Sequence, residues 1–299
     1  MNVVSAHPRR GARRKGAVPP SVLAQIAAGE IETVNLMEWL AADMSALARN
    51  IAVQAGSERV RFALEEAAAA MADQRITRRL LVGGRALAGS VPDIGGSEFR
   101  FFAEHKSDLV RQWACYAVNE PEISRSIAER LSLTLPFAAD RNMSVREAAW
   151  MAFRPYIVPR VQDVVAMLEP VSRDRNPNLR RFAIEVTRPR SVWGTHIDEL
   201  KRCPQTGLSL LENVREDEVR YVQLAAGNWL NDASKSRPDW VAEICARWSA
   251  DRNPATAVIV RRGLRTVERA AAREAAGYRI VDRSLRHHLE HLEVEEEKC

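Results

Sequence analysis

The 299-residue sequence has few of the features that mark a membrane, secreted or metal-binding protein. No apolar run approaches the roughly 20 residues that a membrane-spanning helix needs, and the basic N-terminus is not followed by the apolar segment of a secretory signal. The four cysteines form no CxxC pair and are widely scattered: Cys115, Cys203, Cys245 and Cys299. This spacing argues against a disulfide framework and a structural zinc site, so we expect a cytoplasmic protein without a membrane span.

Several familiar catalytic motifs are also missing. The sequence contains no GxSxG and no HExxH, and the glycines of residues 81–90 are not followed by GK[ST] or preceded by a strand pattern. Three histidines lie close together near the C-terminus, where a polar helix explains them better than a metal site: His287, His288 and His291. The sequence therefore offers no candidate for metal or nucleophilic catalysis, and we expect no metal and no cofactor.

Charge is unevenly distributed along the chain, which has a formal net charge of +5. Five basic residues and no acidic residue precede Glu30, whereas residues 289–299 carry five acidic residues and one lysine. We therefore predict a flexible basic arm over residues 1–19 and a polar, acidic tail over residues 285–299. The arm suits a polyanionic partner, and it is equally well explained as a solvated extension.

The residues between these ends predict an all-α protein. Aromatic and β-branched runs with a period of two are nearly absent, and apolar residues recur at three- and four-residue spacings, as in amphipathic helices. Prolines divide this region, 20–284, into segments of one or two short helices. The dividing prolines are Pro92, Pro121, Pro136, Pro155, Pro177, Pro189, Pro204, Pro238 and Pro254.

The segments between the prolines also resemble one another. An aliphatic residue followed by arginine recurs in VRQWA (110–114), VREAA (145–149), LRRFA (179–183), VRYVQ (219–223) and VRRGL (260–264). The arginines Arg111, Arg146, Arg180, Arg220 and Arg261 are 35, 34, 40 and 41 residues apart. That period predicts a HEAT-like α-solenoid of stacked helix pairs. One arginine per repeat could line a concave face and follow a phosphate backbone, or pair with acidic residues of the next repeat; the pattern leaves both interpretations open.

The stretch SVREAAWMAFRP (144–155) places unusual side chains on an otherwise small and apolar helix. Glu147, Trp150 and Arg154 follow the i, i+3, i+7 spacing of one helix face. A carboxylate, an aromatic ring and a guanidinium together could form a reactive site. The alternative is that Glu147 pairs with Arg154 or with a neighbouring repeat while Trp150 fills the core.

A second polar face occurs in AAGNWLNDASKSRPDW (225–240). Asn228, Asn231, Asp232 and Lys235 share it by i+3 and i+4 spacing, although Asn and Asp compete with the backbone inside helices. Hydrogen bonds to phosphates or bases would explain them, and so would buried hydrogen bonds between repeats. We favour the first explanation for Asn228 and Lys235 and the second for Asp232.

These stretches resemble known proteins. GNWLNDASKSRPDWV (227–241) and VRRGLRTV (260–267) resemble the C-terminal part of bacterial DNA alkylation repair proteins of the AlkC and AlkD kind. VREAAWMAFRPYI (145–157) and GEIETVNLMEWLAADMSALARN (29–50) are similar to the AlkC branch. The resemblance covers residues 20–268. It implies a HEAT-like solenoid that grips duplex DNA in a concave groove, and a glycosylase that removes cationic N-alkylated purines such as 3-methyladenine.

The sequence departs from that family pattern at three points. The AlkD branch uses an aspartate where this chain offers Glu147. The tryptophan of the 227–235 segment, Trp229, stands one residue away from its place in the family pattern. A shift of one residue turns a side chain by about 100° on a helix, which directs Trp229 toward the core. Some AlkC relatives carry an immunoglobulin-like domain, and nothing after residue 268 has a strand pattern.

The resemblance implies roles for individual residues. Glu147 would stabilise the developing sugar cation and orient a water molecule, and Trp150, with Trp113 one repeat earlier, would stand beside the cationic base. The residues expected to contact DNA are Arg146, Arg154, Arg180, Arg181, Asn228, Asn231, Asp232, Lys235 and Arg261. The expected partner is double-stranded DNA with alkylated bases, bound by a monomer. The alternative is a non-catalytic solenoid that binds DNA structures or proteins, in which Glu147 would pair with the next repeat.

Overall fold

The computed structural model describes residues 9–272, and within that range the chain forms helices and no strand. The α-helices are α1 (Pro20–Ala27), α2 (Leu36–Ala41), α3 (Met44–Gln54), α4 (Glu58–Ala70), α5 (Ile76–Ser90), α6 (Ser97–Ala103), α7 (Asp108–Val118), α8 (Ile127–Ala138), α9 (Met143–Phe153), α10 (Val161–Ser172), α11 (Pro177–Val186), α12 (Asp198–Arg202), α13 (Leu208–Val214), α14 (Arg220–Ser234) and α15 (Pro238–Ser249). Short 3-10 turns are η1 (Lys15–Ala17), η2 (Arg154–Tyr156) and η3 (Pro204–Gly207). A further helix begins at Pro254 and continues at least to residue 272. The predicted all-α class is confirmed.

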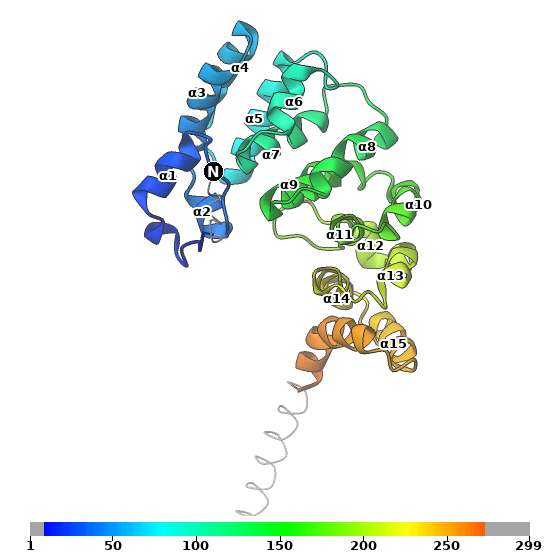
Figure 1. Cartoon of the computed structure of the whole chain (residues 1–299). Coiled ribbons are helices and arrows are strands. Elements are labelled where there is room, and N and C mark those ends of the chain that lie inside the picture. Colours follow the sequence, from blue (N-terminus) through cyan, green and yellow to red (C-terminus); the bar gives the residue numbers. More distant parts are fainter. Residues whose placement is uncertain (1–8, 273–299) are drawn as a thin grey trace, which may run out of the picture.

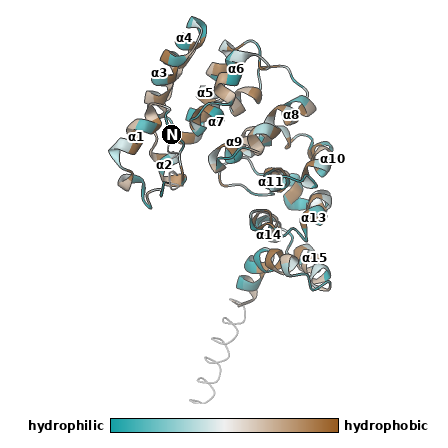
Figure 2. Ribbon diagram, viewed as in Figure 1, coloured by the Kyte–Doolittle hydropathy of each residue, from teal (hydrophilic) through white to brown (hydrophobic). Residues whose placement is uncertain are grey.

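The helices form one continuous row, with a second helix packed beside several of its members. In the row α5, α7, α9, α11 and α14 pack each against the next, and beside it α6, α8 and α10 pack against α7, α9 and α11 respectively. Figure 1 shows these pairs following one another along a curved path from α3 to α15. Figure 2 shows polar and apolar residues alternating along most helices, as expected of helices that bury one face. The pairs stack as the repeat predicts, and the superhelical twist of HEAT repeats stays a prediction.

Proline has two different positions in these helices. Pro177, Pro238 and Pro254 each begin a helix, where the missing N–H costs nothing. Pro136 was expected to separate helices, but it lies inside α8, in the last turn. The helix continues for only two residues beyond it, so a single hydrogen bond near a helix end is lost there rather than the whole element.

Three of the repeated arginines hold the turn that precedes their own helix. Arg111, Arg146 and Arg180 each donate from Nη1 to the backbone carbonyls five and six residues earlier, at distances of 2.6–3.3 Å. Arg111 also forms a bidentate pair with Asp140 at 2.8 and 2.9 Å, in the turn before α9. Arg180 binds Asp217 in the same way at 2.6 and 3.1 Å. For these two arginines, pairing with the neighbouring repeat is therefore the correct interpretation.

The other two arginines of the predicted repeat are out of register. Arg111, Arg146 and Arg180 lie four residues after their N-cap residue, whereas Arg220 follows its N-cap directly. Gln223 takes the equivalent place in α14 and donates to the carbonyl of Asp217 at 2.9 Å. Arg261 lies well inside the helix that begins at Pro254. The arginine period therefore holds for three helix pairs and not for five.

Part of the predicted basic arm is fixed to the body. Arg9 binds Glu38 of α2 through Nη2 and Oε2 at 2.8 Å, and the Asn35 side chain donates to the carbonyl of Ala12 at 2.8 Å. Residues 9–12 are thus anchored rather than flexible. The first eight residues and the predicted acidic tail, 285–299, lie outside the described residues, as does the end of the predicted repeat region beyond residue 272.

His105 makes the stability of this fold depend on pH. Burial lowers the pKa of His105 from its ordinary value of 6.5 to about 4, with Lys106 and Arg111 acting in the same direction, and its Nδ1 accepts from the backbone N–H of Ser107 at 3.0 Å. Because the folded state binds fewer protons between these pKa values, stability is lost as the pH falls from 6.5 toward 4. Between pH 7 and pH 5 the wild type should lose about 2 kcal/mol more unfolding free energy than His105→Gln.

Urea unfolding of the two proteins at both pH values measures this difference. Glutamine keeps an acceptor for Ser107 and does not titrate, so acidic side chains contribute equally to both proteins. An equal loss in wild type and variant would show that His105 is not the group responsible.

Candidate functional site

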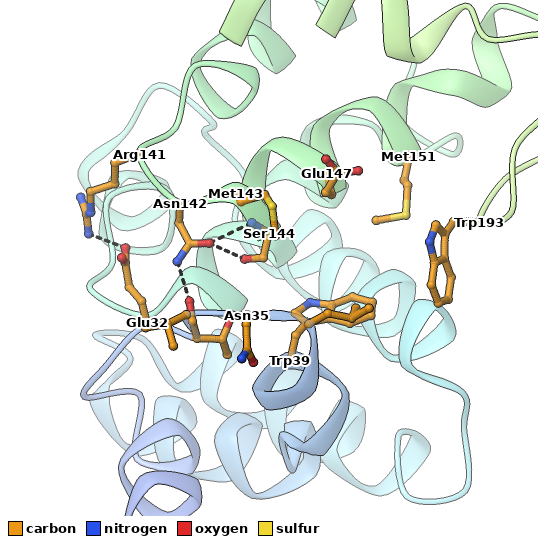
Figure 3. A pocket seen from close by; sticks show the side chains of 13 residues that line it. Glu32, Asn35, Trp39, Arg141, Asn142, Met143, Ser144, Glu147, Met151 and Trp193 are labelled. Carbon is orange, nitrogen blue, oxygen red and sulfur yellow. Dashed lines mark hydrogen bonds and ion pairs between the residues drawn. The ribbon is translucent and has the colours of Figure 1, made fainter. Parts of the chain in front are cut away.

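A cavity of about 280 Å³ lies between the chain before α2, the start of α9 and the segment that follows α11. Figure 3 shows Glu147 and Met151 of α9 above Trp39 of α2, with Trp193 at the end of the view next to Met151. The remaining lining residues are Glu32, Thr33, Val34, Asn35, Leu36, Arg141, Asn142, Met143 and Ser144. The cavity thus combines one carboxylate of α9 with aromatic and apolar walls, a composition typical of small-molecule pockets.

Two tryptophans form the aromatic wall. Their ring centroids lie 6.2 Å apart, and the rings are nearly perpendicular, at 81°. Trp39 is 6% exposed and donates from Nε1 to Oε1 of Gln112 at 2.9 Å, which fixes its ring. Trp193 is 46% exposed. An electron-rich ring that borders a cavity attracts a cationic ligand.

Glu147 is held in place by two donors. Its Oε1 pairs with Nη2 of Arg181 at 2.6 Å, and its Oε2 accepts from the indole N–H of Trp150 at 2.7 Å. The side chain is still 28% exposed and lines the cavity. A carboxylate has about four acceptor sites, so two remain for a water molecule or a ligand.

Arg181 belongs to the next helix pair, on α11, and is itself held. Its guanidinium lies over the ring of Tyr221, 4.3 Å from the centroid, and 3.6 Å from Glu185. Glu147 therefore pairs with a neighbouring repeat, one of the two arrangements considered for a structural role, and it does not pair with Arg154. The carboxylate is at once part of an ion pair between helix pairs and a wall of the cavity.

A buried carboxylate fixes the floor of the cavity. Asp108, at the start of α7, accepts from the backbone N–H and the hydroxyl of Thr33 at 2.9 and 2.6 Å, and from the hydroxyl of Ser144. Burial raises the pKa of Asp108, against the lowering effect of these hydrogen bonds. Asn142 donates to the carbonyl of Thr33 at 2.9 Å. Residues 32–34 are thereby locked against α7 and α9.

Two predicted aromatic residues do not face the cavity. Trp150 is buried, donates its indole N–H to Glu147 and does not line the cavity. Trp113 is fully buried beneath α5, where a Cβ on Gly83 would approach its ring to 2.5 Å. Trp39 and Trp193 take the expected aromatic position instead. A tryptophan flanked by serine, valine and glycine between helices, as in SVWGTH (191–196), was the available signal for Trp193.

Arg154 also has a different role from the one predicted. It is 1% exposed, and its guanidinium donates to the carbonyls of Val186, Arg188 and Thr195 at 2.8, 2.6 and 2.7 Å. Burial lowers the pKa of Arg154 to about 10. The side chain cannot reach a phosphate, and it fixes the segment 187–196 that carries Trp193.

The other predicted phosphate contacts are engaged within the protein. Arg146 donates to carbonyls of its own turn and lies 5.2 Å from the ring centroid of Tyr221. Arg180 is paired with Asp217 and Arg181 with Glu147. Arg261 is exposed and, in the described part of the chain, has no hydrogen bond or ion pair. Of the predicted arginines, Arg261 alone remains accessible without such a partner.

The polar face of α14 ties helices together. Asn231 is buried; its amide donates to Thr266 at 2.7 Å and its oxygen accepts from Arg265 at 2.7 Å. Asn228 accepts from Arg262 at 2.8 Å, and the DNA contact favoured for it stays a prediction.

Asp232 is likewise structural, as favoured from the sequence. It binds Arg188 at 2.6 and 2.9 Å, and Lys235 joins the same carboxylate at 2.9 Å while staying exposed. Trp229 faces the core, as its displacement predicted, and donates to the carbonyl of Thr187 at 3.0 Å. The segment therefore joins α14 to its neighbours.

Residues 9–272 contain neither a membrane-spanning helix nor a cluster of metal-binding side chains. No helix there combines the length and the apolar character that crossing a membrane requires. No group of three or more His, Cys, Asp or Glu side chains in that range is placed to hold a metal ion.

Comparison with known proteins relates this fold to one solved enzyme. No protein-family model matches the chain. The uncharacterised protein YhaZ of Bacillus subtilis (strain 168) is 33% identical over 141 residues, which are 46% of this chain and 39% of YhaZ. The alkylpurine DNA glycosylase AlkC of Pseudomonas fluorescens, solved bound to DNA containing an abasic site analog, matches with a TM-score of 0.62 and 22% identity over 83% of this chain and 62% of AlkC. The chain thus spans less than two thirds of either protein, and the resemblance to AlkC is confirmed for the fold.

The buried guanidinium of Arg154 should be essential to stability. Arg154→Met would leave three backbone carbonyls without their charged donor, at a cost of about 3 kcal/mol or more in unfolding free energy. Arg173→Met is the matched control, because Arg173 is largely exposed and its pair with Glu169 is a surface pair worth at most about 1 kcal/mol. Urea unfolding measures both, and equal effects would contradict the role assigned to Arg154.

Proposed function

We propose that this protein is a DNA glycosylase of base excision repair that hydrolyses the N-glycosidic bond of cationic N-alkylated purines, such as 3-methyladenine, in duplex DNA. The observation that carries the proposal is the position of Glu147 across a tryptophan-walled cavity from Trp39 and Trp193. The fold shared with AlkC, which was solved with DNA containing an abasic site analog, supports DNA as the partner. The protein would act as a cytoplasmic monomer.

The chemistry requires little more than this cavity contains. A purine alkylated at N3 or N7 already carries a positive charge and leaves without being protonated. The enzyme must stabilise the cationic sugar that develops and guide a water molecule to C1′. A fixed carboxylate can do both, through its charge and by orienting or deprotonating the water. Glu147 is that group, and its hydrogen bonds with Arg181 and Trp150 keep it from turning away.

The aromatic wall supplies affinity for the charged base. A desolvated cation–π contact is worth about 2 kcal/mol, so two tryptophans favour a cationic purine over a neutral one. This attraction acts on binding, because the base loses its charge as it leaves. Since the substrate is labile, the carboxylate needs to supply only a small share of the roughly 8–23 kcal/mol by which enzymes commonly lower barriers. Trp39 and Trp193 replace Trp150 and Trp113 in this role.

One observation favours a second function, a non-catalytic protein that binds DNA structures. Both oxygens of Glu147 already have partners, and Arg181 offsets its charge. A carboxylate committed to an ion pair between helix pairs is what a purely structural role would require. The two functions differ in whether the chain releases base from alkylated DNA.

Release of 3-methyladenine from methylated duplex DNA is the deciding measurement. We expect release by the wild type and a loss of about 100-fold or more in Glu147→Gln, because the substitution removes the negative charge at nearly constant volume. Glu169→Gln is the matched control, since Glu169 lies on α10 and outside the cavity.

The outcomes separate the two functions when DNA affinity is measured beside release. Activity lost only in Glu147→Gln, with affinity retained, supports the glycosylase. Equal activity in all three proteins would show that the catalytic group is a residue other than Glu147. Salt-sensitive DNA binding by a wild type that releases no base would establish the non-catalytic binder.

Trp193 should contribute to selection of the cationic base. Trp193→Leu is expected to lower kcat/KM for 3-methyladenine release by about tenfold, which corresponds to about 1.4 kcal/mol of lost cation–π attraction. Trp193→Phe should recover part of that loss, because it restores an aromatic face without the full ring. A leucine variant as active as the wild type would show that Trp193 does not help to bind the base.

A further inference from the structure

The tripeptide Asp-Arg-Asn occurs three times in the chain, each time in the turn before a helix. The three copies are residues 140–142, 174–176 and 251–253. They precede α9, α11 and the helix that begins at Pro254. Because the same three residues recur at equivalent places of a helical stack, we examine what each of them does.

The first and third residues of the motif shape the turn. Asp140 accepts from the backbone N–H of Asn142 at 2.7 Å, and Asn142 accepts from the N–H of Ser144 at 2.8 Å and so caps α9. The turn before α11 has the same two hydrogen bonds, at 2.7 and 2.9 Å. The middle residues, Arg141 and Arg175, contribute no side chain to either turn. Their guanidinium groups are exposed instead.

The repeated arginines hold the backbone of these exposed cations. In three turns the arginine four residues after the N-cap donates from Nη1 to the carbonyl of the exposed residue that precedes the N-cap. The pairs are Arg111 with Lys106, Arg146 with Arg141 and Arg180 with Arg175, at 3.3, 2.9 and 3.0 Å. One cation of each pair is therefore used inside the protein, and it fixes the position from which the other meets solvent.

The exposed cations have few acidic partners. Lys106 and Arg175 form no ion pair with a carboxylate in the part of the chain that the structure describes. Arg141 is 65% exposed and pairs with Glu32 at 2.9 Å, as Figure 3 shows. The same oxygen of Glu32 is also bound by Arg111, at 2.5 Å. Because Arg111 already offsets the charge of Glu32, Arg141 keeps much of its capacity to attract an anion.

The turn before α14 departs from this pattern at both places. Gln223 stands where the other helices have the repeated arginine, and the exposed turn residue is Glu218. The inner arginine and the outer cation are thus both missing there. In the last turn Arg252 is exposed again, without an inner arginine, and its φ of 51° is a left-handed conformation that is costly for a residue other than glycine.

The turns follow one another along one edge of the stack. The first turns of α9 and α11 are joined by Glu147 and Arg181, each five residues after its N-cap. The other links between successive turns are the ion pairs Arg111–Asp140, Arg180–Asp217 and Arg215–Asp251. Packed helices lie about 8–10 Å apart, so the four steps from α7 to the last helix cover roughly 30–40 Å. One turn of duplex DNA is about as long, roughly 34–36 Å.

We propose that Lys106, Arg141 and Arg175 form a track for the phosphates of duplex DNA along this edge. Glu218 interrupts the track, and Arg252 resumes it at the next turn. Each cation that contacts a phosphate releases counterions, which favours binding without regard to base sequence. The inference rests on the proposed binding of duplex DNA, and it assigns backbone contacts to the turn cations instead of to the arginines that hold the turns.

The salt dependence of binding to an unmodified duplex of about two helical turns, roughly 20 base pairs, tests the track. Arg175→Gln and Lys106→Gln should each weaken binding several-fold and reduce the slope of log K against log salt by about 1, measured by fluorescence anisotropy on the full-length protein. Arg160→Gln is the matched control, because Arg160 is exposed and precedes α10, at the opposite end of α9 from Arg141. Its slope should equal that of the wild type.

A gain of binding tests the interruption, and a misfolded variant cannot imitate it. Glu218→Arg should tighten binding and steepen the salt slope by about 1, because it supplies the missing cation. Glu243→Arg makes the same change of charge on the exposed face of α15, beside the row and not at its edge, and should leave the slope unchanged.

The outcomes separate the track from the proposed function. Slopes of Arg175→Gln and Lys106→Gln equal to that of Arg160→Gln overturn the track, and so does a Glu218→Arg that binds no better than Glu243→Arg; base release by the wild type would still support the glycosylase. Reduced slopes in a protein that releases no base would support the track together with the non-catalytic binder. A wild type that does not bind duplex DNA at low salt overturns both proposals.

Discussion

The buried carboxylate of Asp108 is the interaction on which the candidate site depends. An isolated charge or polar group in the interior is costly unless donors surround it, and here the donors come from parts of the chain far apart in sequence. Thr33 lies 75 residues before Asp108, and Ser144 lies 36 residues after it. Satisfying one carboxylate thus draws the chain before α2 against the start of α9. The cavity of Glu147 exists because those two segments are held together.

Arginine has two separate uses in this protein, and composition does not distinguish them. Arg111 and Arg180 close turns and pair with the next helix pair, while Arg154 supports a loop from inside. Each satisfies buried carbonyls or carboxylates, which a planar guanidinium does well. Lys15 and Arg75 have no acidic partner in the described residues and border a groove. Positive charge without an acidic partner in the described residues therefore lies beside the N-terminal segment, and among the repeated arginines also at the exposed Arg261.

The sequence predicted the helical fold, and physical reasons limit what else it could predict; the catalytic role of Glu147 stays a proposal. Helix periodicity is local, so the all-α class and the stacking of pairs follow from spacing. Glu147 and Trp150 are three residues apart on one helix, and their hydrogen bond was within reach of the same argument. Trp39 and Trp193 meet only in three dimensions. A contact between residues that are so far apart leaves no periodic trace in the sequence.

Because the chain is synthesised from the N-terminus, the stacked helix pairs can fold in that order. Helix pairs that contact mainly their neighbours can form as soon as they are complete, from the N-terminus onward. The cavity has different requirements, because its walls come from residues 32–39, 141–151 and 193. A growing chain therefore has several folded helix pairs before it has a site. A ribosome that stops before residue 193 would release a protein with much of this architecture and no complete pocket.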